Sequence, residues 1–302
     1  MNPLEQRINN VAGSIGLIKR AWRRSARLKA GLLITFFIAA LAVMGQHLAP
    51  YPSEGAGIVP ANAAERMGKP PSLEFPFGTD NLGRDVLSRV LMGARLALLQ
   101  VLLVAGASLG VGLLVGVYAA YYRGAIETLL NYATEIFLAL PAIVLALALR
   151  IALGQGLHVV VVSLVLSWWP WYARASYVYA RVVAEMEYVL LAQLAGVPGR
   201  IIVFRHVLRN VLPAVLVQAI TDLGSVLLEA SAINFLGLGL RPDEPDWGII
   251  VQNGFKYITS MPWVSMFPGL FILVTALGFS MVGDSLREEV DPRMRRRWKL
   301  WF

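Results

Sequence analysis

The sequence predicts an all-α polytopic membrane protein with six transmembrane helices. Of its 302 residues, 57% are hydrophobic and only 15% are charged, whereas soluble domains carry roughly 25% charged residues. Its long apolar runs match the about 20 residues that a helix needs to cross a hydrocarbon core of about 30 Å. Because lipid offers the backbone no hydrogen-bond partner, these runs are expected to be helical.

The six runs cover residues 30–49, 96–121, 125–152, 157–180, 212–236 and 264–282. The first follows the long basic segment 1–29, which favours a membrane anchor over a cleaved signal peptide. Three segments remain between the runs: an outer loop over 50–95, a second loop over 181–211 and another outer loop over 237–263.

The positions of the basic residues predict the orientation of these helices. An even number of spans places both termini on one side, and that side holds 19 of the 27 Lys and Arg residues. They include those of the terminal segments 1–29 and 287–302. The positive-inside rule therefore predicts both termini in the cytoplasm. The net charge of +8 is interpreted as a topology and lipid-headgroup signal, with no nucleic-acid partner.

The first outer loop ends in the stretch FPFGTDNLGRDVLSRVLMGARLAL. Thr79 or Asp80 is predicted to cap a helix, since a short oxygen side chain accepts hydrogen bonds from the first turn. The apolar spacing that follows indicates a helix on the membrane surface, leading into the second span. Its polar face is expected to carry Arg84, Asp85, Ser88 and Arg89.

Small residues follow in the second span. Gly106, Gly110, Gly112 and Gly116 form two GxxxG spacings, which allow another helix to approach closely. That helix belongs either to this chain or to a second membrane subunit.

Ionisable residues inside spans are costly unless they face a partner or a polar cavity. Glu135, Asp222 and Glu229 are therefore candidates for a translocation pathway, and Asn234 is added as a polar candidate in the fifth span. Pro141 is predicted to kink the third span beside Glu135. The alternative is that these groups form internal hydrogen bonds or ion pairs that only fix helix packing.

The stretch AEMEYVLLAQLAGVPGRIIVFRHVLRNVLP, residues 184–213, covers most of the loop over 181–211. It predicts one helix over 185–195 and another over 201–210, separated by Gly196, Pro198 and Gly199, with Pro213 starting the fifth span. Such an apolar helix pair on the cytoplasmic side favours docking to a soluble partner. The alternative is that the pair packs on its own membrane domain.

No motif for catalysis, cofactor binding or metal binding is found. The chain has no cysteine, which excludes disulfides and thiolate chemistry. It has no GxxxxGK[ST] loop, no complete dinucleotide fingerprint and no His pair with metal-ligand spacing. We therefore predict a protein that is not an enzyme and that takes energy from an ion gradient or from another subunit.

Three segments together resemble one known family. They are the loop EYVLLAQLAGVPGRIIVFRHVLRNVLP, the outer stretch FPFGTDNLGRDVLSRVLMGARLAL and the late stretch that starts FLGLGLRPDEPDWGIIVQNGF. The chain resembles the C-type permeases of the dipeptide/oligopeptide/nickel family of ABC transporters, from about Trp22 to Arg293.

The resemblance implies a type I ABC importer permease fold with a core over 96–286, in the cytoplasmic membrane. It also implies a homologous B-type permease, two cytoplasmic ATPases that bind ATP and Mg²⁺, and an extracytoplasmic binding protein. Di- or oligopeptides are the implied substrates, with nickel chelates, glutathione and oligosaccharides as alternatives. An ion-gradient-driven secondary transporter is the rival from another class.

The resemblance further implies that the 181–211 loop is a coupling helix seated on an ATPase. The coupling residues are then Glu187, Ala192, Gly196, Arg200, Arg205 and His206. This chain departs from the family at Leu190-Leu191, where Glu-Ala is usual.

Overall fold

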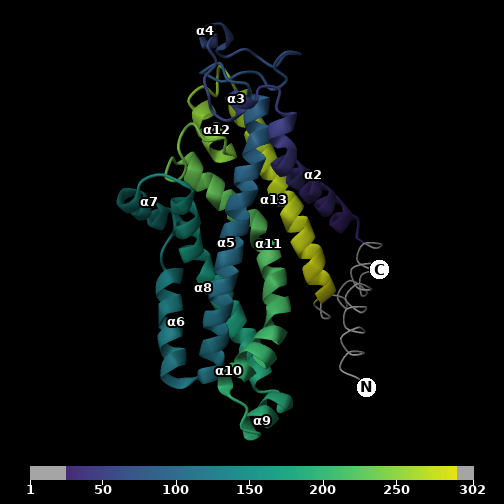
Figure 1. Ribbon diagram of the computed structural model, residues 1–302, viewed down its shortest axis with the longest axis vertical. Coiled ribbons are helices and arrows are strands. Elements are labelled where there is room, and N and C mark those ends of the chain that lie inside the picture. Colours follow the sequence, from purple (N-terminus) through teal and green to yellow (C-terminus); the bar gives the residue numbers. More distant parts are fainter. Residues whose placement is uncertain (1–24, 291–302) are drawn as a thin grey trace.

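The protein is an elongated bundle of helices in the computed structural model, which describes residues 25–290 (Figure 1). The long helices are α2 (Ala26–Leu48), α5 (Val86–Tyr122), α8 (Leu157–Ala184), α11 (Leu208–Phe235) and α13 (Trp263–Val290). The shorter ones are α3 (Pro52–Gly55), α4 (Ala63–Arg66), α6 (Gly124–Leu138), α7 (Ala142–Leu153), α9 (Glu187–Leu194), α10 (Gly199–Ile201) and α12 (Trp247–Phe255). Most of the predicted basic terminal segments, 1–24 and 291–302, lie outside the described residues.

Four helical segments within residues 25–290 are long and apolar enough to cross a membrane: Ala26–Leu48, Val86–Tyr122, Gly199–Phe235 and Trp263–Glu288. The bent pair α6–α7 adds a fifth candidate if it counts as one span. The 28-residue α8, predicted as a span, is not among them, because its second half is rich in Trp, Tyr and Arg. It nevertheless packs along α5 in the centre of the bundle.

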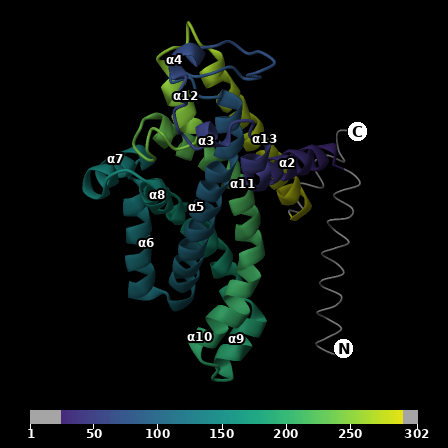
Figure 2. The ribbon, with the colours of Figure 1, turned by 45° about the horizontal axis from the view of Figure 1, so that its top comes forward.

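The two ends of the bundle carry different short helices and different hydrophobic clusters. Both views place α3, α4 and α12 at one end and α9 and α10 at the other (Figures 1 and 2). We call the first the outer end and the second the inner end, following the charge-based orientation. One hydrophobic cluster, around Trp247 and Ile233, fills the outer half. A second cluster, around Tyr172 and Val203, fills the inner half.

Buried charge closes the outer end. Arg66 donates two hydrogen bonds to the carboxylate of Glu54, at 2.8 and 3.1 Å. The guanidinium carbon lies 4.8 Å from the ring centre of Tyr51 and 4.6 Å from that of Phe75. The two rings stack on each other, with their centres 5.5 Å apart. The guanidinium therefore packs against both rings, which contribute cation–π attraction.

The separate surface helix predicted before the second span is absent from the described outer segment. Instead, α5 is one continuous helix of 37 residues, capped by Asp85, which accepts a hydrogen bond from the backbone N–H of Ser88 at 2.7 Å. The predicted caps belong to the preceding loop. Asp80 accepts backbone hydrogen bonds from Leu82 and Arg84, at 2.8 and 2.9 Å, and Thr79 donates to the carbonyl of Arg66.

The predicted polar face of that segment is buried. Relative exposures are 2% for Arg84, 0% for Asp85, 0% for Ser88 and 1% for Arg89. The outer loops cover this face. Long charged side chains are rarely buried unless they are paired, and both arginines have partners here. Arg84 pairs with Asp80 at 2.7 Å, and Arg89 donates to the carbonyls of Asp243 and Glu244. Burial raises the pKa of the Asp85 carboxyl, against hydrogen bonds from Ser88 that lower it.

The third predicted span is broken rather than kinked. The helices α6 and α7 meet at an angle of 87°. Pro141 starts α7 as its N-cap with extended backbone. Proline disfavours the helical conformation in the residue before it and lacks an N–H group, so α6 ends at Leu138 and the chain turns.

The second predicted loop helix and the fifth span are one structure. Helix runs without interruption from Gly199 to Phe235, with a π-helical turn at Ile202–Val207 (η1) and Pro213 inside α11. A proline inside a membrane helix is tolerated where neighbouring groups satisfy the freed carbonyl. The prediction that Pro213 starts the span was therefore wrong.

Candidate functional site

The tip of the inner end is a helix, a turn and a second helix. α9 ends in a turn at Gly196, whose φ of +74° lies in the left-handed region that favours glycine. The N–H of Gly196 donates to the carbonyl of Gln193 at 3.0 Å, and that of Val197 donates to Ala192 at 3.1 Å. These bonds satisfy the carbonyls that the helix end leaves free.

The tip is attached to the bundle by few apolar residues. Val189 of α9 is fully buried in the inner cluster together with Ile202 and Val203. On the same short helix, Leu191 and Leu194 expose 64% and 85% of their surface. The loop is therefore anchored on one side and presents apolar side chains on the other.

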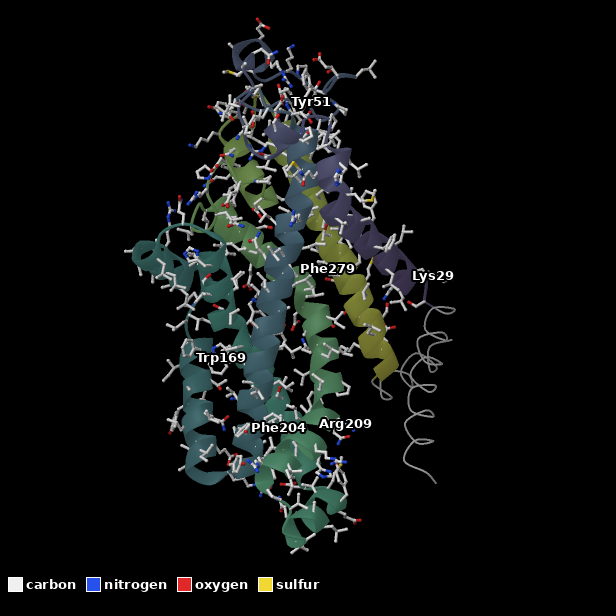
Figure 3. All side chains as sticks on the ribbon, viewed as in Figure 1. Lys29, Tyr51, Trp169, Phe204, Arg209 and Phe279 are labelled. Carbon is white, nitrogen blue, oxygen red and sulfur yellow. The ribbon has the colours of Figure 1, made fainter. Side chains whose placement is uncertain are left out.

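The structure brings the six predicted coupling residues to this one end. Figure 3 labels Phe204 and Arg209 there, next to α9 and α10. Glu187, Gly196, Arg200 and Arg205 are exposed, and Ala192 and His206 are half-buried. The His206 ring lies 6.1 Å from that of Tyr188, which connects α9 with the π-helical turn.

Sequence reasoning missed the π-helical turn. It occupies Ile202–Val207, between the tip and the membrane-spanning part of α11. Such wide turns are rare and often lie at functional sites. A π turn differs from an α turn by one inserted residue. No residue pattern in the sequence predicts where this insertion occurs, because helix packing determines its position.

The predicted pathway residues do not form a single group. Glu135 on α6 is exposed and lies 3.6 Å from Arg174 of α8. Glu229 on α11 accepts a hydrogen bond from the indole N–H of Trp168 at 2.9 Å. Pro141 lies at the α6–α7 bend. Asp222 lines a cavity.

That cavity, of about 590 Å³, lies between α8 and α11. Its walls include Trp168, Trp171, Tyr172, Tyr179, Gln218 and Asp222. The run of aromatic residues in α8 is visible in the sequence, but its pairing with α11, about 50 positions later, is a property of the fold. A second cavity, of about 540 Å³, opens at the outer end between Leu82, Asp243 and Lys256.

Asn234, another of the predicted pathway residues, has a fully buried side chain. Its carbonyl oxygen accepts from the backbone N–H of Leu240 at 3.2 Å, and its amide donates to Gln100 at 2.9 Å. Gln100 in turn donates to Asp246 at 2.8 Å. The chain of bonds ties α5, α11 and α12 together, an arrangement that fits the packing alternative.

Asp246 completes this network as the cap of α12. Its carboxylate accepts from the backbone N–H groups of Gly248 and Ile249, at 2.8 and 3.3 Å. Burial raises the pKa of Asp246, while the hydrogen bonds from Gln100 and the helix terminus lower it. No group of three or more His, Cys, Asp or Glu able to hold a metal ion occurs within residues 25–290.

Comparison with known proteins gives consistent matches. The family described as binding-protein-dependent transport system inner membrane component matches residues 112–296. The dipeptide transport system permease protein of Alkalihalophilus pseudofirmus is 37% identical over 227 residues, 74% of this chain and 74% of the relative. The di/tripeptide transport system permease protein of Pseudomonas aeruginosa is 35% identical over 288 residues, 92% of this chain and 93% of the relative.

A solved structure has a similar fold. A chain of the MetNI methionine ABC transporter, in an inward-facing conformation, aligns with a TM-score of 0.51 and 22% identity. The alignment covers 67% of this chain and 96% of that chain.

Proposed function

This chain belongs to the binding-protein-dependent transport system inner membrane components, and we propose that its substrates are dipeptides and short oligopeptides. It is a membrane-spanning permease subunit of an ABC importer in the inner membrane. The family resemblance found in the sequence is thereby confirmed. The peptide assignment is supported by the names of the relatives from A. pseudofirmus and P. aeruginosa. Glutathione, nickel chelates and oligosaccharides are the alternatives.

As a binding-protein-dependent importer permease, the chain works with ATPase subunits and a substrate-binding protein. In our proposal, a homologous B-type permease and two ATPases complete the importer. ATP and Mg²⁺ are bound by the ATPases, and this chain contributes no catalytic residue. Exposed apolar side chains on α6 and α7 support a membrane-embedded partner beside lipid; they include Leu129, Tyr132, Ile136, Val144 and Ile151.

One observation carries the proposed mechanism: the continuous helix from Gly199 to Phe235. At its inner end it joins the tip that presents Leu191 and Leu194. Near its middle it carries Asp222, which lines the α8–α11 cavity. A displacement of the tip on an ATPase is thus passed along one continuous helix to the cavity wall, since packed helices move as bodies.

Purification and reconstitution of the whole importer test this function. We expect the chain to co-purify with a second permease and with ATPase subunits. In proteoliposomes with ATP inside and the binding protein outside, we expect uptake of labelled dialanine. Recovery of the chain alone would contradict the subunit composition, and uptake of a different ligand of the binding protein would replace the peptide assignment.

A substitution at Gly196 tests the coupling role of the tip. Proline fixes φ near −65° and has no N–H, so Gly196→Pro loses both the turn and the bond to Gln193. We expect uptake to fall at least about tenfold while assembly persists. Gly196→Asn is the matched control, because asparagine tolerates the left-handed region, and it should keep most of the uptake. Normal uptake by the proline variant would remove the tip from the coupling mechanism.

A further inference from the structure

We propose that the cavity between α8 and α11 is a transient subsite for the protonated amine of the transported substrate, with Asp222 as its counter-charge. The inference rests on the proposed peptide function and adds a recognition chemistry to it. It starts from four features of the cavity: its charge, a tyrosine hydroxyl beside that charge, its aromatic walls and its size.

Asp222 provides a negative charge that no cation neutralises directly. None of the described residues 25–290 forms an ion pair with it within 4.0 Å; its carboxylate accepts hydrogen bonds from the side-chain amide of Gln218 at 2.9 and 3.1 Å. Arg174, on the α8 wall, is paired with Glu135 at 3.6 Å. Arg287 of α13 acts on Asp222 only at longer range. An ionisable group at this depth is costly without a partner, so a cationic ligand would gain from entering.

Tyr172 lines the same cavity. Its buried hydroxyl interacts with the Asp222 carboxylate, although no hydrogen bond of normal geometry reaches it within the described part of the chain. Tyr172 has a relative exposure of 0%, and buried polar groups are nearly always hydrogen-bonded. Its ring lies 6.2 Å from that of Trp168. The hydroxyl is therefore a neighbour of any cation that Asp222 binds.

The aromatic walls favour an organic ammonium group. Trp168, Trp171 and Tyr172 contribute aromatic rings to the wall, and such rings attract a cation within about 6 Å. An ammonium also donates charge-assisted hydrogen bonds to a carboxylate. A metal ion is disfavoured, because no group of three acidic or His ligands is present in the described residues. The volume of about 590 Å³ falls within the about 300–1,000 Å³ typical of small-ligand pockets. The α-amino group of a peptide, with a pKa near 8, is mostly protonated at neutral pH.

Charged thiol reagents test the cavity directly, because the chain contains no cysteine. Ala175 lines the cavity and is half-buried. In the assembled importer, Ala175→Cys is labelled with a cationic and with an anionic methanethiosulfonate reagent. We expect the cationic reagent to react about tenfold faster, because a charged cleft concentrates counter-ions. Adding Asp222→Asn should remove most of this preference, and millimolar dialanine should slow the labelling.

Two control variants separate the site charge from general electrostatics. Asp222→Glu should retain the preference for the cationic reagent. Glu127→Gln removes a carboxylate that Arg181 already neutralises at 3.3 Å, so it should leave the preference unchanged. Equal rates for both reagents, or no reaction with either, would overturn the subsite.

Uptake measurements in proteoliposomes distinguish a failure of the proposed subsite from a failure of the proposed peptide function. If the wild-type importer carries dialanine, we expect Asp222→Asn to lower the maximal rate several-fold while the binding protein's affinity for the peptide stays the same. Unchanged uptake in that variant would overturn the subsite alone. If the wild-type importer carries no peptide that its binding protein holds, the peptide function fails, and the amine subsite fails with it.

Discussion

The outer and inner ends of this permease hold their charged groups in opposite ways. At the outer end, the side chains of the pairs Glu54–Arg66 and Asp80–Arg84 are each less than 10% exposed. At the inner end, the pair Arg123–Glu185 has a similar contact distance of 2.8 Å, yet its side chains are 50% and 59% exposed. The carboxylate–guanidinium ion pair is therefore part of the core at the outer end and part of the solvent-exposed surface at the inner end.

The difference extends to the apolar residues. Trp247 of the outer end is fully buried, and its indole donates to the carbonyl of Val90 at 2.9 Å. At the inner tip, Leu191 and Leu194 are largely exposed. The outer end thus completes its own core, whereas the inner end leaves an apolar surface for a partner to cover. An uncovered apolar tip is what the proposed docking on an ATPase requires.

The largest expected effect comes from breaking the buried pair at the outer end. Arg66→Ala leaves the Glu54 carboxylate buried without its partner, and removing one partner of a buried pair costs about 3–5 kcal/mol. It also removes the cation that packs against the rings of Tyr51 and Phe75. We expect a loss of this size in unfolding titrations of the purified chain in mixed micelles. A loss below about 1 kcal/mol would show that the outer end is solvated like the inner one.

Positions of the membrane helices were largely predictable, because the length of an apolar run is a local property. The first span was expected at 30–49 and is Ala26–Leu48; the last was expected at 264–282 and is part of Trp263–Val290. The break at Pro141 was located correctly, but its size was not, since the bend angle depends on how α7 packs against α8.

The buried outer charges were not predictable from spacing. Arg89 lies on a helix face that reads as polar, and its carbonyl partners at Asp243 and Glu244 are more than 150 positions away. The site shows the same limit. Asp222 and Asn234 look alike in sequence, as polar groups in one apolar run, yet one lines a cavity and the other is buried against Gln100.

The second expected effect concerns how the inner half is held together. A methyl group on Gly116 would meet the backbone carbonyl of Ala173 on α8, whereas one on Gly110 would meet nothing within 4 Å. Of the two GxxxG pairs, only that of Gly112 and Gly116 packs on α8 in this chain. Gly116→Ala should therefore destabilise by about 1–3 kcal/mol through overpacking. Gly110→Ala, on the same helix, should be neutral or stabilising by up to about 1 kcal/mol. Equal effects in the same unfolding titrations would contradict the close α5–α8 contact.

The smallest expected effect comes from the exposed pair at the inner end. Glu185→Gln removes the partner of Arg123, but water solvates both groups already, so the loss should stay below about 1 kcal/mol. The coupling energy from a double-mutant cycle with Arg123→Gln should also be below about 1 kcal/mol, and it should shrink further with added salt. The equivalent cycle on Glu54 and Arg66 should give several times more. A coupling as large at the inner pair as at the outer one would mean that the inner surface is covered even in the isolated chain, and the docking role of the tip would lose its main support.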